Sequence, residues 1–140
     1  MEERTQPAYC YIQSGAIPYR EGAAGPEILL VTNHKGTRWG IPKGIHEPGC
    51  SARASAANEA LEEAGVLGEV GAEVLGTYTV KKWGGTCTIT VFPMRVTSML
   101  ADAEWAESHR GRRWVPAERA AREIRKQSLQ RIVARFAETL

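Results

Sequence analysis

The chain has 140 residues, enough for one domain with a single hydrophobic core. Its 18 Lys and Arg nearly balance 16 Asp and Glu, and the net charge of +2 argues against a strongly basic nucleic-acid binder. No stretch reaches the roughly 18 consecutive apolar residues of a membrane helix. The first apolar run, residues 8–17, lacks the basic start and long apolar core of a signal peptide, so we expect a soluble protein.

The elements expected in chain order alternate between strands and helices. Residues 9–19 and 27–32 read as strands, residues 72–81 and 87–97 as a hairpin around Gly84 and Gly85, and residues 112–115 as a last strand. Pro93 indicates an edge strand or a bulge. Pro116 starts a short helix, and residues 127–139 form an amphipathic one. A mixed sheet between helices is the natural packing of this order.

Residues 44–66 carry the strongest local signal. Ser51 can cap a helix that ends at Gly65, a residue suited to the left-handed position after a helix. Glu59, Glu62 and Glu63 stand at i, i+3 and i+4 and are expected on one face. The apolar residues expected on the opposite, core-facing side are Ala57, Ala60, Leu61 and Ala64.

Three clustered carboxylates repel one another by roughly 0.2–0.5 kcal/mol per exposed pair. Either solvation or a bound cation offsets this repulsion, and on the carboxylates alone both interpretations remain open. Oxygen ligands favour Mg²⁺, with Mn²⁺ as a substitute, over Zn²⁺, because no His or Cys is spaced with these glutamates as in a zinc site.

The same segment resembles the Nudix box, in which Gly, five residues, Glu, seven residues and Arg-Glu precede an aliphatic residue, any residue, Glu-Glu, any residue, Gly and an aliphatic residue. The positions that match are Gly44, Glu59, Ala60, Glu62, Glu63, Gly65 and Val66. Cys50 replaces the first Glu and Asn58 replaces the Arg. The similarity covers about residues 8–136 and is greatest to the branch acting on diadenosine polyphosphates and diphosphoinositol polyphosphates. That branch is suggested by Trp39 with Pro42-Lys43-Gly44, by Lys81-Lys82, and by Trp105-Ala106-Glu107 followed by Arg110 and Arg112-Arg113-Trp114.

The resemblance implies an α/β fold, an α/β/α sandwich with a mixed sheet, formed by a single domain over residues 1–140 with its core at about 8–137. It implies metal binding by the box glutamates Glu59, Glu62 and Glu63, with the Gly44 carbonyl as a further ligand. The general base is either a box glutamate or a glutamate from a later loop. Glu107 is the first loop candidate and Glu104 the second, each with a solvated loop carboxylate as the alternative.

Several basic residues are candidates for binding substrate phosphate. Lys43 lies beside the start of the acidic helix, and its backbone is restricted by Pro42 and Gly44. The other candidates are Arg38, Lys81, Lys82 and Arg112, for which a solvated surface is the alternative. Trp39 and Trp114 are expected in the core, whereas Tyr78, Trp83 and Trp105 are candidates for the substrate rim.

Histidines and cysteines form no recognisable site. His34, His46 and His109 have no common spacing and are expected at the surface. Cys10, Cys50 and Cys87 are widely separated and odd in number, which indicates reduced thiols and a cytoplasmic protein.

Two functions follow from the resemblance. The first is a Mg²⁺-dependent hydrolase that cleaves a phosphoanhydride bond in a nucleoside diphosphate-linked or diphosphoinositol-type small molecule. The second is a catalytically impaired Nudix module that binds such a ligand without efficient turnover. Cys50 and Asn58 favour looser support of the metal-binding helix, hence slower turnover. No nucleic-acid or membrane partner is expected, and the protein is expected to be a monomer or a homodimer.

Overall fold

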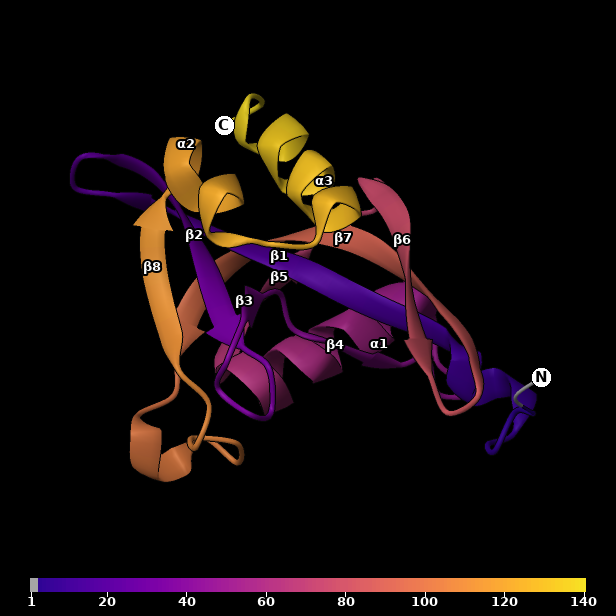
Figure 1. Ribbon diagram of the computed structural model, residues 1–140. Helices are drawn as coiled ribbons and strands as arrows, with labels where there is room; N and C mark the ends of the chain where they lie inside the picture. Colours follow the sequence, from indigo (N-terminus) through magenta and orange to yellow (C-terminus); the bar gives the residue numbers. More distant parts are fainter. Residues whose placement is uncertain (1–2) are drawn as a thin grey trace.

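A computed structural model describes residues 3–140 of the chain, which fold around one eight-stranded mixed sheet (Figure 1). The strands are β1 Ile12–Gly22, β2 Gly25–Thr32, β3 Trp39–Gly40, β4 Lys43–Ile45, β5 Val66–Val70, β6 Gly76–Lys82, β7 Gly85–Met99 and β8 Arg112–Pro116. The helical elements are η1 Ala8–Tyr11, α1 Ala52–Glu59, η2 Ala60–Ala64, η3 Asp102–Glu104, α2 Ala117–Ala120, η4 Ala121–Glu123 and α3 Gln127–Ala137. In this part of the chain, no helix has the length and apolar character needed to cross a membrane.

Strand β1 is the centre of the sheet. It runs parallel to β7, with Ile12 opposite Thr88 and Tyr19 opposite Arg95. It is antiparallel to β2 and β4, and β2 in turn pairs with β3 and β8. Strands β5 and β6 both pair antiparallel with β7. The parallel β1–β7 pair within otherwise antiparallel neighbours makes the sheet mixed, as predicted.

Helices cover both faces of the sheet because the buried strands are apolar on both sides. On one face, Ala56, Ala60 and Ala64 of α1 and η2 pack against strand residues such as Leu29 and Phe92. On the other, α2 and α3 pack on alternate strand residues; α3 contributes Leu129, Ile132, Val133 and Phe136. The expected α/β/α sandwich is confirmed.

The acidic helix forms as the sequence predicts at both ends. Ser51 Oγ accepts a hydrogen bond from the Ala54 amide at 3.0 Å, which caps α1. Gly65 has φ 64° and ψ 36°, the left-handed conformation that ends a helix at little steric cost for glycine. The last turn, η2, is a π-helix, a form often found at functional sites. Across α1 and η2 together, Ala56, Ala60 and Ala64 are buried. Ala57 and Leu61, which were also expected on the core side, are only half-buried.

Two local expectations differ from the structure. Residues 8–11 form a short 3₁₀ turn, so the first strand begins at Ile12 rather than at residue 9. Pro93 lies in β7, which is flanked by β1, and not in an edge strand. It occurs between the segments of β7 that pair with β6 and with β5, where the Pro93 carbonyl accepts from the Gly71 amide at 2.8 Å. The missing N–H is tolerated there because the ladder is interrupted.

Candidate functional site

A cavity of about 860 Å³ opens at the end of the sheet that carries the acidic helix. This volume suits a small-molecule ligand. Three carboxylates line it, from Glu47, Glu59 and Glu63. They are outnumbered by eight basic side chains, from Lys35, Arg38, Lys43, Lys81, Lys82, Arg110, Arg125 and Lys126.

Glu59 and Glu63 are one helical turn apart and both face this cavity. The Glu63 carboxylate accepts a hydrogen bond from the Lys43 amide at 3.0 Å, which ties α1 and η2 to strand β4. Glu59 lies against Gly44, where a β-carbon would overlap its carboxylate. A glycine at position 44 therefore leaves space for Glu59 next to the main chain.

Burial and the neighbouring Glu63, Glu62 and Glu107 raise the pKa of Glu59 to about 7. Burial also raises the pKa of Glu63, although its hydrogen bond from Lys43 and the nearby Arg110 act in the opposite direction. Burial lowers the pKa of Lys43, against the effect of Glu63. Negative charge around Glu59 is thus incompletely compensated by the protein, a setting that favours a bound cation.

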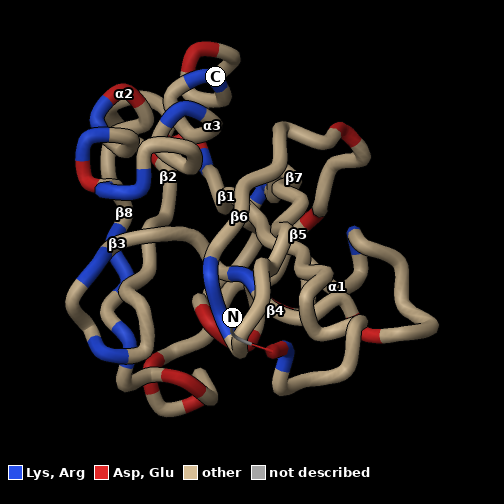
Figure 2. Tube along the Cα trace, turned by 45° about the vertical axis from the view of Figure 1, so that its right-hand side comes forward, with Lys and Arg blue, Asp and Glu red and all other residues tan. Residues whose placement is uncertain are grey.

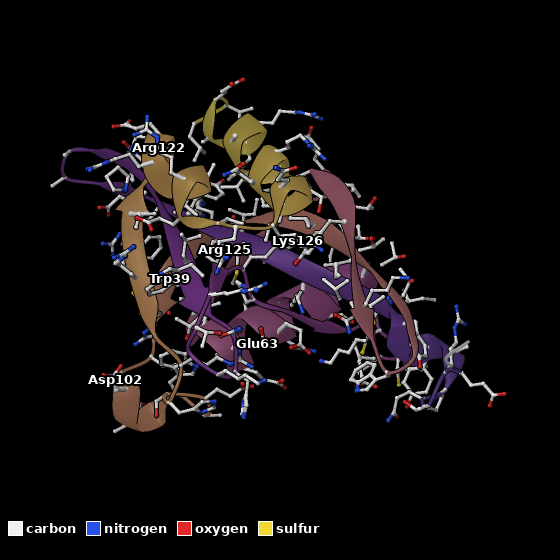
Figure 3. All side chains as sticks on the ribbon, in the orientation of Figure 1. Trp39, Glu63, Asp102, Arg122, Arg125 and Lys126 are labelled. Atoms are coloured by element: carbon white, nitrogen blue, oxygen red, sulfur yellow. The ribbon has the colours of Figure 1, made fainter. Side chains whose placement is uncertain are left out.

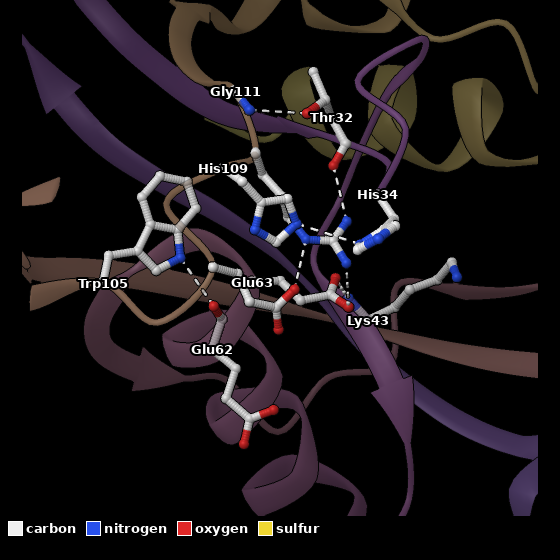
Figure 4. A network of polar contacts seen from close by, with 10 residues as sticks. Thr32, His34, Lys43, Glu62, Glu63, Trp105, His109 and Gly111 are labelled. Atoms are coloured by element: carbon white, nitrogen blue, oxygen red, sulfur yellow. Dashed lines mark hydrogen bonds and ion pairs between the residues drawn. The ribbon is translucent and has the colours of Figure 1, made fainter. Parts of the chain in front are cut away.

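Glu62 is placed differently from the other two box glutamates. Its side chain is exposed, and Figure 4 shows its carboxylate directed away from Glu63. The expectation that all three glutamates share one face is therefore met by Glu59 and Glu63 only, in a last turn that is a π-helix and not a regular α-helix. Within residues 3–140, no three His, Cys, Asp or Glu side chains form a cluster able to hold a metal ion by themselves.

Arg110 joins the acidic helix to the loop that carries Glu107 (Figure 4). Its Nε donates to Glu107 at 2.7 Å, its Nη1 donates to the Thr32 carbonyl at 3.0 Å, and its Nη2 lies 3.6 Å from Glu63 Oε2. The Arg110 side chain is only 12% exposed, so these contacts are shielded from competing water. Arg110 therefore links Glu107 to Glu63, although Glu107 does not itself line the cavity, whereas Glu104 is exposed on η3.

The expected phosphate-binding residues divide into two groups. Lys43, Arg38, Lys81 and Lys82 line the cavity, and Figure 2 shows basic residues at the end of β6 and around β3. Arg112 does not line the cavity. Its Nη1 donates to the carbonyls of Ala64 (2.9 Å) and Gly65 (3.3 Å), and its Nη2 to Leu100 (2.6 Å). These contacts direct the guanidinium to the end of the acidic helix and not to a substrate.

Trp105 supports the same helix end. The indole Nε1 donates to the Glu62 carbonyl at 2.9 Å, and the Arg112 guanidinium lies 4.4 Å from the centre of its ring. Trp105 is 4% exposed and is not at the cavity rim. Orphan carbonyls at a helix C-terminus need partners, and Arg112 and Trp105 provide them here.

Cys50 and Asn58, the two departures from the box pattern, are both exposed. An ion pair at these positions would therefore be solvated and would contribute about 0–1 kcal/mol. The contacts of Arg112 and Trp105 hold the helix from its other end. Loose support of the helix does not follow from these two substitutions.

The remaining aromatic and histidine candidates take mixed positions. Trp39 and Trp114 are half-buried in strands, and Tyr78 is 4% exposed although it and Trp83 line the cavity. His34 and His109 are exposed, as expected, and their rings meet with Nε2 of His109 3.3 Å from Nδ1 of His34. His46 is half-buried, and its Nε2 lies 2.5 Å from the Cys50 carbonyl oxygen.

Three polar residues of the cavity, Gln13, Arg125 and Lys126, were not singled out from the sequence. Arg110 was noted there only as part of the motif that follows Glu107. The other three give no local signal, because they reach the cavity only through the packing of β1 and of the segment before α3.

We expect Glu59→Gln to raise the melting temperature in EDTA at pH 8. The folded-state pKa of Glu59 is about 7 against an ordinary 4.5, so the folded state holds this proton more tightly. Stability from this group is present below about pH 4.5 and is lost as pH rises toward 7. The variant lacks this loss, so its advantage should shrink as pH falls toward 5. Thermal unfolding at pH 5, 6, 7 and 8 measures it.

The exposed Glu73→Gln is the control and should follow wild type across the series. With saturating Mg²⁺ the order should reverse, because a cation that binds the folded wild type stabilises it by mass action. A Glu59→Gln advantage that is the same at pH 5 and pH 8 would contradict the burial of an uncompensated carboxylate at position 59.

The fold and the site define an α/β protein with one sheet and a pair of carboxylates in a cavity that is also lined by basic side chains. The family model of the NUDIX domain matches residues 13–136, and the chain belongs to the Nudix family. "Nudix hydrolase 17, mitochondrial" of Arabidopsis thaliana is 36% identical over 110 residues, covering 72% of this chain and 59% of that protein. "Nudix hydrolase 12, mitochondrial" of the same plant is 30% identical, over 88% of this chain and 70% of its own length.

Solved structures show the same fold. The crystal structure of the C. elegans Ap4A hydrolase superimposes with a TM-score of 0.72 at 20% identity, covering 91% of this chain and 96% of that one. A NUDIX hydrolase from Nitrosomonas europaea gives 0.67 at 20% identity, over 91% of this chain and 69% of its own. At such identity the likeness establishes the fold and not the substrate.

Proposed function

We propose that this chain hydrolyses a phosphoanhydride bond, with Mg²⁺ or in its place Mn²⁺, in a nucleoside diphosphate-linked or diphosphoinositol-type substrate. The observation that carries the proposal is the convergence of Glu59 and Glu63 in a cavity that eight basic side chains also line. Carboxylates for a hard cation and cations for phosphate are the two requirements of such a reaction. The Ap4A hydrolase named above, which shares the fold, is our reason for testing substrates with linked phosphates.

The residues present fit a magnesium ion. Mg²⁺ is commonly held by one or two carboxylates and keeps several waters or substrate oxygens, so two glutamates suffice. Glu59 and Glu63 would be those ligands, with the Gly44 carbonyl beside them and Glu62 contributing charge from the exposed side. The raised pKa of Glu59 and the space left by Gly44 support this assignment. A cation held there supplies charge that neutralises phosphate oxygens and makes nearby water more acidic.

The chain's own residues supply orientation and charge. The Lys43 amide fixes Glu63, and the Lys43 side chain faces the cavity beside it, where it would bind a phosphate oxygen. Arg110 contacts both Glu107 and Glu63, which makes Glu107 our choice of loop base to orient and deprotonate water. Arg38, Lys81 and Lys82 would bind the outer phosphates. Holding the reacting groups in fixed positions increases the rate of the chemical step many-fold.

The second candidate is a module that binds the ligand without efficient turnover, and only Cys50 and Asn58 favour it. Both are exposed and neither contacts Glu59 or Glu63 in the hydrogen bonds and ion pairs of residues 3–140. The shared cavity of Glu59, Glu63 and Lys43 supports catalysis. We therefore favour the enzyme.

Turnover by the wild-type protein tests the choice. ADP-ribose, diadenosine tetraphosphate and a diphosphoinositol phosphate are incubated with protein and Mg²⁺, and products are separated by chromatography. We expect at least one compound to be cleaved at its phosphoanhydride, no cleavage in EDTA, and recovery when Mg²⁺ or Mn²⁺ is added back. Tight binding of a compound with no cleavage in any metal would favour the binding module.

We also expect a cytoplasmic location and a simple assembly, and both stay predictions. The three cysteines are free, and Cys10 and Cys87 are buried, which suits the reducing cytoplasm. A monomer or a homodimer remains the expected assembly.

A further inference from the structure

Besides Lys43, six basic side chains of the cavity have no acidic partner within 4.0 Å among residues 3–140. Within the described residues 3–140, the ion pairs of 4.0 Å or less involve Arg20, Arg95, Arg110, Arg112 and Arg113. The cavity residues Lys35, Arg38, Lys81, Lys82, Arg125 and Lys126 take part in none of them. Gathering like charges around one cavity is unfavourable unless an anion or solvent compensates it. These side chains are therefore available to an anionic ligand.

Arg125 and Lys126 occupy a distinct place among these six. They form the connection between η4 and α3, and Figure 3 shows them on the side of the sheet where α3 packs, above Glu63. Arg122, three residues earlier, lies at the outer side by α2. Residues Arg125 and Lys126 thus lie on a wall of the cavity contributed by a segment more than 60 positions beyond Glu63 in the chain.

The connection is held in one conformation by its neighbours. Ile124 is 2% exposed and Leu129 is 4% exposed, so the pair of basic residues is anchored in the core on both sides. Gln130 Nε2 donates to the carbonyls of Ala121 at 3.0 Å and Ile124 at 3.2 Å. A fixed backbone reduces the entropy lost when the two side chains close on a ligand.

A basic side chain already lies over one face of each tryptophan ring of the cavity. Arg113 lies 4.8 Å from the ring centre of Trp39, and Lys82 lies 4.3 Å from that of Trp83. The buried Gln13 side chain, 2% exposed, also lines the cavity, and its Oε1 has no hydrogen-bond partner among residues 3–140. The unpaired basic charge thus favours an anionic group over a stacked base, whereas the Gln13 oxygen is an acceptor and would need a donor from the ligand.

We propose that Arg125 and Lys126, together with Lys81 and Lys82, form a second anion site that binds phosphate groups of the ligand other than those being cleaved. Preferred ligands would then carry phosphate at two separated places. The inference rests on the proposed function in one respect, that the scissile phosphates lie at Glu59 and Glu63. The second site itself requires no reaction.

Binding of inositol hexakisphosphate, a compact carrier of six phosphates without a phosphoanhydride bond, tests the site. Isothermal calorimetry is done in EDTA at about physiological ionic strength, where long-range surface attraction is screened. We expect Arg125→Gln/Lys126→Gln to weaken binding by ~10- to 100-fold, as expected for the loss of charge-assisted hydrogen bonds. Both residues are exposed, and melting temperatures should confirm that the fold is kept.

The control is Arg122→Gln/Arg131→Gln, which removes the same two charges from exposed positions outside the cavity. It should bind the probe within about threefold of wild type, since distant surface charges act only through the screened field. If both double variants weaken binding of inositol hexakisphosphate equally, net charge alone explains the loss and the proposed second site is wrong. Unchanged binding by Arg125→Gln/Lys126→Gln, or no binding by wild type, would also overturn it. Because no hydrolysis is measured, a failed hydrolase assay leaves this result interpretable.

Discussion

Glu63→Gln should reduce phosphoanhydride hydrolysis by about 10²- to 10³-fold or more. The glutamine amide oxygen can still accept the hydrogen bond from the Lys43 amide, so the loop and helix stay joined. What is lost is the negative charge proposed to hold the cation, and removing one preorganised electrostatic group commonly costs this much in kcat. Initial rates at saturating Mg²⁺ on the best substrate of the panel measure the effect.

The matched control is Glu73→Gln, an exposed carboxylate in the segment before β6 that does not line the cavity. It should keep wild-type rates. In EDTA, Glu63→Gln should melt no lower than wild type, because burial already disfavours the ionised carboxylate at this position. Near-wild-type turnover by Glu63→Gln at saturating Mg²⁺ would refute its assignment as a ligand.

Arg112→Gln should destabilise the protein by about 2–4 kcal/mol and lower the melting temperature by roughly 6–15 °C. The guanidinium is 13% exposed and donates to carbonyls of Ala64, Gly65 and Leu100, which a glutamine cannot all reach. Carbonyls at the end of the acidic helix would then lack partners. Because Glu63 lies in that last turn, we also expect kcat to fall while the dissociation constant for inositol hexakisphosphate stays close to that of wild type.

Arg113→Gln is the neighbouring control for stability. The Arg113 side chain is 48% exposed and pairs with Glu123 at 3.1 Å on the surface, a contact worth less than about 1 kcal/mol. Its melting temperature should fall by only a few degrees at most. A direct role of Arg112 in phosphate binding would instead show as weakened binding of inositol hexakisphosphate by Arg112→Gln at unchanged stability.

The sequence by itself determined the local features of the site. Ser51 as the cap, Gly65 as the left-handed terminator and the turn that brings Glu59 above Glu63 all depend on residues within four positions of one another. The apolar patterns likewise indicated strands β1, β2, β6, β7 and β8 and a sheet between helices, but not the shorter strands β3, β4 and β5. Such features are readable because short-range geometry is nearly the same in every helix and strand.

Only the tertiary structure decided which basic residues face the cavity. Arg112 and Arg113 are adjacent, but one binds carbonyls 48 positions away at the end of the helix and the other lies over Trp39. Arg125 and Lys126 reach the cavity because α3 packs across the sheet. A long charged side chain at the surface has little local preference for direction. Its partner is set by the chain segments that packing brings within its reach, and the sequence around it does not encode that neighbourhood.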